Sequence, residues 1–370
     1  EDFLTSKDRE FRRLIREFHS FSEAEFEIPD QMKGILRNYQ ESGFRWLKTL
    51  GQYQFGGILA DDMGLGKTVQ MITLLEDMKK QYICQKSQQD EKNQRDLTPP
   101  HSIIIAPAAL IFNWQAELAR FAPDLSVLVV TGNQQERAQL LTQSDDYDVI
   151  VTSYDLLKRD IAEYEGKSFD VEVIDEAQNI KNSTTAAAKS VKLIDSKVRY
   201  ALTGTPIENR LSELWSIFDY LMPGFLYKYQ TFKKVFETPI VKHQDDDMSQ
   251  QLKQMISPFI LRRLKKDVLK DLPPKLEEVY FAGLSGEQQK LYDGEVTKLK
   301  TELGTTSKED FSKKRFQILA ELTKLRQICC DPSLCVDNYK GESAKRAACL
   351  QLIPDAVEAG HKILVFCQFT

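Results

Sequence analysis

Short apolar runs alternate with helical patterns over much of the chain. Between about residues 34 and 225 the runs are rich in β-branched side chains, and amphipathic helical segments separate them. The runs lie at 57–60, 102–106, 125–130, 148–152, 171–174 and 199–202. Alternation of this kind is typical of βαβ units. The pattern therefore predicts an α/β fold in which helices flank both faces of a parallel sheet.

The segments on either side of this region follow other patterns. In residues 7–26, apolar residues recur at helical spacing, which predicts an amphipathic helix that packs on a neighbouring domain. The residues of this apolar face are Phe11, Leu14, Ile15, Phe18 and Phe21. Between 226 and 330 helical patterns dominate, and a short β-like run at 277–281 interrupts them.

Two polar segments and one apolar run complete the pattern. Residues 85–100 and the acidic run 245–247 are expected to form exposed loops. Residues 362–370 are apolar enough to predict a buried parallel strand. Because such a strand needs neighbours, we expect the sequence to be a fragment of a longer protein.

Composition narrows the class of protein. A length of 370 residues predicts two or three domains. Hydrophobic residues at 42% and charged residues at 28% indicate a globular chain with a core, not a fibrous or disordered one. No apolar run approaches the roughly 20 residues that span a bilayer, so no membrane helix is expected. The six cysteines suit reduced thiols better than a disulfide scaffold or a zinc site.

The charge balance restricts how the chain could bind nucleic acid. Fifty basic and 55 acidic residues give a net charge of −5. This excludes a uniformly basic surface, but it leaves open a local basic groove, because phosphates respond to the local field.

The strongest chemical signal is a glycine-rich segment at 61–68, between the run ending at Ala60 and a helical pattern. Strand, loop and helix in this order are typical of a phosphate-binding loop, whose backbone N–H groups face the phosphates. Lys67 would reach the β- and γ-phosphates of a nucleotide, and the Thr68 hydroxyl would hold Mg²⁺. Asp61 departs from the strict motif, which has glycine there, and a simple glycine-rich turn is the alternative. The other residues predicted to contact the nucleotide are Asp62, Met63, Gly64, Leu65 and Gly66.

Two further segments follow predicted strands. Asp175 and Glu176 stand at the carboxyl end of the run 171–174, where open α/β sheets bind ligands. Asp175 would hold Mg²⁺, and Glu176 would be the general base for an attacking water. Seen alone, such a pair is more often a strand cap or a helix N-terminal pair. Residues Thr203, Gly204 and Thr205 could sense the γ-phosphate, or could form an ordinary polar turn.

With these three segments in order, the chain resembles the superfamily-two nucleic-acid-dependent ATPases, and among them the SWI/SNF-type (Snf-two) DNA translocases. Further segments match that family: 36–43 resembles its adenine-reading Q motif, which implies that Gln40 contacts the base. Residues 106–114 and 151–154 resemble its motifs Ia and Ib. Segment 258–275 resembles the joint between its two lobes, and Gln178 falls among its catalytic residues. The resemblance implies DNA-backbone contacts by Asn113, Trp114, Thr152 and Ser153.

The same resemblance implies a RecA-like P-loop fold, with ATP and Mg²⁺ as ligands and double-stranded DNA as partner. The implied divisions are a helical extension (1–33), lobe one (34–225), a helical protrusion and linker (226–275) and the start of a truncated second lobe (276–370). The joint carries a basic cluster, which is either a solvated face or a phosphate or cross-lobe contact. Its residues are Arg262, Arg263, Lys265 and Lys266.

The implied function is an ATP-driven motor that moves along DNA and shifts a bound protein complex. A strand-separating helicase and an ATP-gated scaffold without turnover are the alternatives. The family's arginine fingers would lie beyond Thr370, so this chain is expected to be nearly inactive. The Asp-Glu-Ala-Gln segment, with Asp61 and Asp62 before the loop, resembles the bacterial members of the family. We expect a monomer in the cytoplasm, or in the nucleus if the protein is eukaryotic, with no membrane association.

Overall fold

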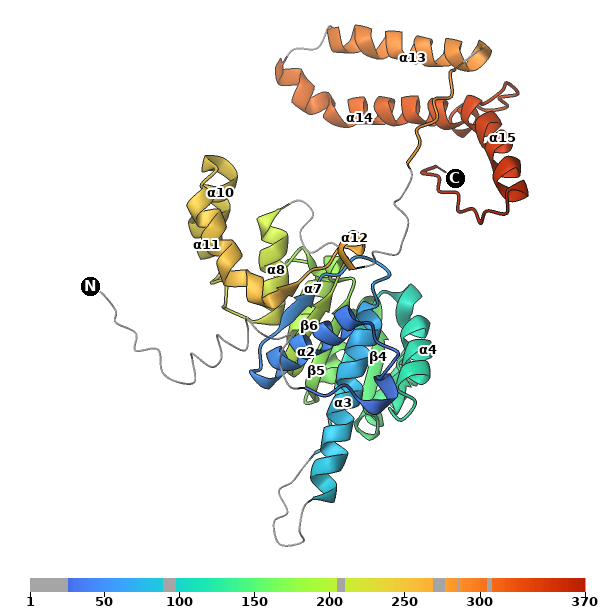
Figure 1. The fold of residues 1–370 in the computed structure, drawn as a ribbon. Helices are drawn as coiled ribbons and strands as arrows, with labels where there is room; N and C mark the ends of the chain where they lie inside the picture. Colours follow the sequence, from blue (N-terminus) through green and yellow to red (C-terminus); the bar gives the residue numbers. More distant parts are fainter. Residues whose placement is uncertain are drawn as a thin grey trace. The chain divides into compact units, whose positions relative to one another are not determined.

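A computed structural model describes residues 26–88, 98–204, 210–268, 277–284, 286–304 and 308–369. The chain divides into two compact units, residues 1–273 and 274–370 (Figure 1). The predicted helix at 7–26 lies almost wholly outside the described residues, as does Thr205. The predicted domain boundaries after residues 33, 225 and 275 stay predictions.

The first unit is built on a seven-stranded sheet with the strand order β3-β4-β2-β5-β6-β1-β7. Every strand pair in it is parallel. The strands are β1 (Gly57–Leu59), β2 (Ser102–Ala106), β3 (Val127–Val129), β4 (Val149–Ser153), β5 (Ser168–Asp175), β6 (Asp195–Leu202) and β7 (Ile260–Leu261). Each of the six apolar runs overlaps one of the strands β1 to β6. The predicted α/β fold with a parallel sheet is therefore confirmed, whereas β7 was not predicted, because a strand of two residues leaves no periodic pattern.

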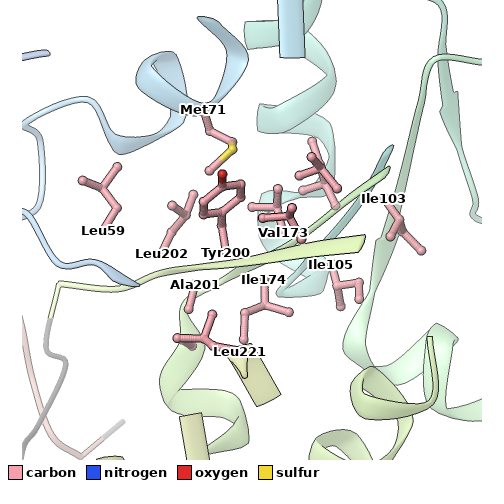
Figure 2. Close-up of a cluster of buried hydrophobic side chains, with 14 of the residues drawn as sticks. Leu59, Met71, Ile103, Ile105, Val173, Ile174, Tyr200, Ala201, Leu202 and Leu221 are labelled. Atoms are coloured by element: carbon pink, nitrogen blue, oxygen red, sulfur yellow. The ribbon is translucent and has the colours of Figure 1, made fainter. Parts of the chain in front are cut away.

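Helices cover both faces of this sheet. The main ones are α2 (Asn38–Gln52), α3 (Lys67–Ser87), α4 (Ile111–Phe121), α5 (Gln134–Thr142), α6 (Tyr154–Asp160), α7 (Ala186–Leu193) and α8 (Leu211–Leu221). Side chains alternate along β6, so that Tyr200 points toward Met71 of α3 and Ala201 lies on the opposite face, near Leu221 of α8 (Figure 2). All four side chains are buried. The sheet is thus the middle layer of the core, as period-two alternation requires.

Short helices connect these elements. They are η2 (Asp30–Met32), η3 (Ala108–Leu110), η4 (Ser144–Asp146), η5 (Ile161–Tyr164) and η6 (Ala177–Ile180).

After α8 the chain makes a helical excursion and then returns to the sheet. The excursion contains α9 (Tyr229–Phe232), the π-helical turn η7 (Lys233–Glu237), α10 (Thr238–His243) and α11 (Asp246–Ile256). The return contains η8 (Ser257–Phe259), β7 and α12 (Lys265–Val268). The acidic run 245–247 is not a loop: Asp245 caps α11 by accepting from the Met248 N–H, at 3.0 Å. Carboxylates are stabilised at helix N-termini, which explains the correction.

The second unit consists of helices and extended segments in its described part. The helices are α13 (Gly286–Gly304), α14 (Lys308–Cys330), η9 (Pro332–Leu334) and α15 (Ala344–Glu358). The β-like run 277–281 forms no strand, and neither does the described part of the run 362–370. Phe366 is 89% exposed there. The strand predictions for these two runs are wrong for this structure, because a strand needs a paired neighbour and the described part of this unit supplies none.

Two properties of the described residues concern membranes and metals. No described helix has both the length and the apolar character needed to cross a bilayer. No group of three or more His, Cys, Asp or Glu side chains in the described ranges is placed to hold a metal ion, and this includes Cys329, Cys330 and Cys335.

Candidate nucleotide-binding site

The glycine-rich segment 61–68 connects the end of β1 to the first turn of α3. Gly64 and Gly66 have positive φ angles of 84° and 77°, a left-handed conformation that glycine adopts without strain. A Cβ on Gly66 would lie only 2.4 Å from Nε2 of Gln40. Lys67 is the first residue of α3, and its Nζ donates to the carbonyl oxygen of Asp61, at 2.8 Å. The loop therefore delivers Lys67 and the free N–H groups of a long helix to one place, which is an arrangement that binds phosphate.

Asp175 lies at the carboxyl end of β5 and is buried. Its Oδ2 accepts a hydrogen bond from the indole Nε1 of Trp114, at 2.9 Å, and its Oδ1 accepts from the backbone N–H of Glu176, at 2.8 Å. Burial raises the pKa of Asp175 from its ordinary value, and these two hydrogen bonds oppose the rise. The side chain is thus oriented by donors on two elements.

Glu176 has a left-handed backbone with φ of 51°, which is uncommon outside glycine and is often found at functional sites. Its Oε2 accepts from Nε2 of Gln178, at 2.7 Å. The Gln178 Oε1 in turn accepts from the Thr203 hydroxyl, at 3.1 Å. Because β5 and β6 are paired, with Asp175 beside Leu202, the ends of both strands meet at this chain of hydrogen bonds. The candidate base is therefore connected to the segment predicted to sense the γ-phosphate.

The three predicted segments converge at one edge of the sheet. A cavity of about 440 Å³ is lined by residues of the glycine-rich loop, of α4 and of the end of β5. Its polar lining includes Lys67, Thr68, Asp175 and Glu176. Mg²⁺ is usually held by one or two protein oxygens together with phosphates and water. The Thr68 hydroxyl and the Asp175 carboxylate fit that donor set. A Cβ on Gly204 would lie 3.3 Å from Met63 of the loop, so that segment also borders the loop.

Gln40 connects α2 to the glycine-rich loop. Its Oε1 accepts from the Arg37 N–H and its Nε2 donates to the Leu65 carbonyl, both at 2.9 Å. A primary amide has two donor hydrogens and two acceptor lone pairs, so each end keeps one further bonding position. The predicted contact of Gln40 with adenine stays a prediction.

The side chains predicted to contact DNA are not all accessible. Trp114, Thr152 and Ser153 are buried, and the Ser153 hydroxyl caps α6 by accepting from the Leu156 N–H, at 3.2 Å. These three side chains are buried in this structure, and the predicted DNA contacts of Trp114, Thr152 and Ser153 stay a prediction. Asn113 is exposed and lines the cavity.

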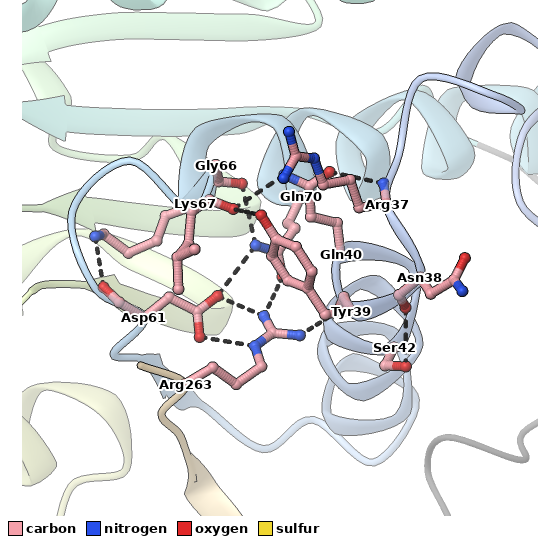
Figure 3. Close-up of polar contacts among 11 residues, drawn as sticks. Arg37, Asn38, Tyr39, Gln40, Ser42, Asp61, Gly66, Lys67, Gln70 and Arg263 are labelled. Atoms are coloured by element: carbon pink, nitrogen blue, oxygen red, sulfur yellow. Dashed lines mark hydrogen bonds and ion pairs between the residues drawn. The ribbon is translucent and has the colours of Figure 1, made fainter. Parts of the chain in front are cut away.

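The sequence did not predict two further features of the site. Glu117 lines the cavity, and burial raises its pKa; its position one helical turn after Asn113 could have indicated this. The second feature is that two arginines of the basic cluster at the joint have different surroundings. Arg262 is exposed, whereas Arg263 forms an ion pair with the buried Asp61 of the loop (Figure 3). No sequence spacing indicates that pair.

Comparison with known proteins gives consistent matches. Residues 39–334 match the SNF2-related domain family. The chain is 42% identical over 337 residues to "Uncharacterized ATP-dependent helicase MG018" of Mycoplasma genitalium, covering 90% of this chain and 30% of that protein. It is 37% identical over 370 residues to "Putative ATP-dependent helicase/translocase YwqA" of Bacillus subtilis, covering 98% and 38%.

A solved structure agrees with these matches. The "Sulfolobus solfataricus SWI2/SNF2 ATPase core in complex with dsDNA" is 39% identical, with a TM-score of 0.58, over 93% of this chain and 69% of that one. The chain spans less than two fifths of the length of the two curated relatives.

Proposed function

The chain belongs to the SNF2-related family, and we propose on that basis that it is the nucleotide-binding part of an ATP-driven motor that moves along double-stranded DNA. The solved relative, an ATPase core in complex with double-stranded DNA, supports duplex DNA as the nucleic acid along which the protein moves. The relatives named as ATP-dependent helicases support ATP as the nucleotide that is hydrolysed. We propose that this movement displaces a protein complex bound to the DNA.

In this proposal the glycine-rich loop binds the nucleotide, and the residues at the end of β5 bind Mg²⁺ and activate the attacking water. The N–H groups at the start of α3 and the Lys67 ammonium bind the phosphates, and Lys67 leaves the Asp61 carbonyl to do so. Thr68 and Asp175 are the protein ligands of Mg²⁺, which neutralises phosphate charge when bound. Glu176 accepts a proton from the attacking water, and Gln178 holds the Glu176 carboxylate in position.

The observation that carries the proposal is the hydrogen-bonded series Thr203–Gln178–Glu176. Thr203, which directly follows β6, is thereby linked to the proposed base Glu176, and Glu176 lines the same cavity as Lys67 and Asp175. A scaffold that never turns over ATP has no need for a positioned base beside a metal ligand. The arrangement therefore favours hydrolysis over passive nucleotide binding.

We further propose that this 370-residue chain alone hydrolyses ATP slowly. An arginine finger at the γ-phosphate accelerates phosphoryl transfer by roughly 10³–10⁵. In the described lining of the cavity the guanidinium present is that of Arg120, on α4. The family resemblance assigns the fingers to the second lobe rather than to α4. Arg120→Ala tests this: unchanged slow hydrolysis is expected, and a large loss would make Arg120 the finger.

Two variants test the roles of the site residues. Lys67→Ala is expected to weaken Mg·ATP binding, because it removes a charge-assisted contact worth about 1.5–3 kcal/mol. Glu176→Gln is expected to bind Mg·ATP as the wild type does and, in a protein extended through the second lobe, to lose turnover. Calorimetry measures both affinities, and phosphate release with duplex DNA measures turnover. An equal loss of affinity in both variants would contradict the assignment of Glu176 as base.

The same assay separates the alternatives. Phosphate release that duplex DNA stimulates, in a protein extended through the second lobe, would exclude a scaffold without turnover. A bare duplex whose strands separate during hydrolysis would indicate a helicase instead of a translocase.

A further inference from the structure

Asp61 occupies the position where a strict phosphate-binding loop has glycine, and its carboxylate is fully buried. The guanidinium of Arg263 contacts both carboxylate oxygens: Nε donates to Oδ1 at 2.8 Å, and Nη2 donates to Oδ2 (Figure 3). The two residues are 202 positions apart in the sequence. A buried carboxylate is costly unless it is paired, and the planar fork of arginine matches it with two parallel hydrogen bonds.

The same guanidinium also contacts the elements on either side of the loop. Its Nη1 donates to the backbone carbonyl of Tyr39 in α2, and its Nη2 donates to Oε1 of Gln70 in α3, at 2.6 Å. Gln70 is fully buried, and its Nε2 donates to Gly66 O at 3.0 Å and to Asp61 Oδ2 at 3.2 Å. One side chain therefore joins the start of the loop to the two helices that hold its end.

The backbone around Arg263 runs alongside the loop. The Ala60 N–H donates to Leu261 O at 2.7 Å, and the Asp62 N–H donates to Arg263 O at 3.0 Å. The Asp62 carboxylate accepts from the Lys265 N–H, at 2.9 Å. These bonds fix the position of the chain on both sides of the fork, so the guanidinium is presented to Asp61 from a constrained backbone.

We propose that Arg263 is a positioning residue for nucleotide binding, which through Asp61 holds the loop in the conformation that directs its N–H groups to the phosphates. The inference rests on the phosphate binding proposed above and adds a residue from outside the glycine-rich loop and the catalytic segments. The alternative is an ion pair that stabilises the fold alone. The two differ in a measurable way: an ion pair of that kind changes the melting temperature but not the nucleotide affinity of the folded protein.

The experiment measures the dissociation constant of Mg·ADP by calorimetry for the 370-residue chain and three variants. These variants are Arg263→Ala, Arg263→Lys and Arg262→Ala. Each titration is made well below the melting temperature of the variant. Arg262→Ala is the matched control, because Arg262 is adjacent and exposed. Arg263→Lys keeps the charge opposite Asp61 and is the variant more certain to fold. One ammonium cannot serve Asp61, Gln70 and the Tyr39 carbonyl in the geometry of the fork.

We expect Arg263→Ala to weaken Mg·ADP binding about tenfold or more, since loss of a partner that orients a binding group typically costs about 10–100-fold. Arg263→Lys is expected to weaken it several-fold, and Arg262→Ala to stay within about twofold of wild type. Should Arg263→Ala not fold, the lysine variant decides. Folded Arg263 variants that bind as tightly as Arg262→Ala would overturn the inference alone. A wild-type chain that binds no Mg·ADP would overturn it together with the proposed function.

Discussion

Substitution of Trp114 by phenylalanine tests how the buried carboxylate of Asp175, the proposed metal ligand, is stabilised in its ionised form. The indole N–H of Trp114 is one of two donors to the Asp175 carboxylate, at 2.9 Å, and both side chains are buried. Phenylalanine keeps most of the apolar surface and removes the donor. The ionised carboxylate would then keep the backbone N–H of Glu176 as its donor.

The expected loss of stability in Trp114→Phe depends on the charge of the hydrogen-bond acceptor, the Asp175 carboxylate. A hydrogen bond to a charged group contributes about 1.5–3 kcal/mol, and a neutral one about 0.5–1.5 kcal/mol. In a domain of this size each kcal/mol lowers the melting temperature by about 2–4 °C. Trp114→Phe is therefore expected to lower the melting temperature of the first unit by about 3–12 °C near neutral pH.

The effect should depend on pH. Burial already raises the pKa of Asp175 in the folded protein, and loss of the indole donor raises this pKa further. A raised folded-state pKa contributes stability below the unfolded value, and that stability is lost as pH rises through the folded value. The cost of Trp114→Phe is therefore largest above the folded-state pKa, where Asp175 is ionised, and it declines as the pH is lowered and the carboxylate becomes protonated.

Trp215→Phe is the matched control for this measurement. The indole N–H of Trp215 donates to the neutral backbone carbonyl of Tyr227, at 3.1 Å, and its side chain is also buried. Phenylalanine at this position removes an indole donor whose acceptor is uncharged, and it keeps an aromatic ring beside Tyr229 and Lys192. Urea unfolding followed by far-UV circular dichroism, at neutral and at moderately acidic pH, gives the difference in unfolding free energy between the two variants. A difference that does not change with pH would refute the reasoning.

Three further predictions concern the glycine-rich loop, recognition of the adenine base of the nucleotide, and the binding of DNA. Gly66→Ala should weaken Mg·ADP binding more than Gly166→Ala does: both glycines have φ near 78°, but only the new methyl group at Gly66 would meet Gln40. Equal affinities in calorimetry would contradict this. Gln40→Ala should narrow the preference for ATP over GTP in competition binding; unchanged discrimination would make Gln40 purely structural. Duplex DNA should bind weakly and without sequence preference, with log K falling by about 2–4 per decade of salt, and sequence-selective binding that persists at high salt would argue against a motor.

Local patterns in the sequence were enough to predict the sheet and the position of its chemistry. The apolar runs that became β1 to β6 alternate with helices, and that alternation is set by the spacing of side chains along each element. The loop around Lys67 and the carboxylates Asp175 and Glu176 each directly follow such a run. Because parallel strands end at the same edge, their convergence on one cavity followed from the strand pattern.

The tertiary structure alone decided which partners these residues have. Trp114 was assigned to DNA from its motif, but helix α4 turns it inward onto Asp175. Arg263 was one member of a basic cluster until the return of the chain as β7 placed it beside Asp61. A hydrogen bond between distant positions leaves no periodic signal in either segment, because it depends on how whole elements pack. The fold class was therefore readable from neighbours in sequence, whereas the groups that orient the site were determined by neighbours in space.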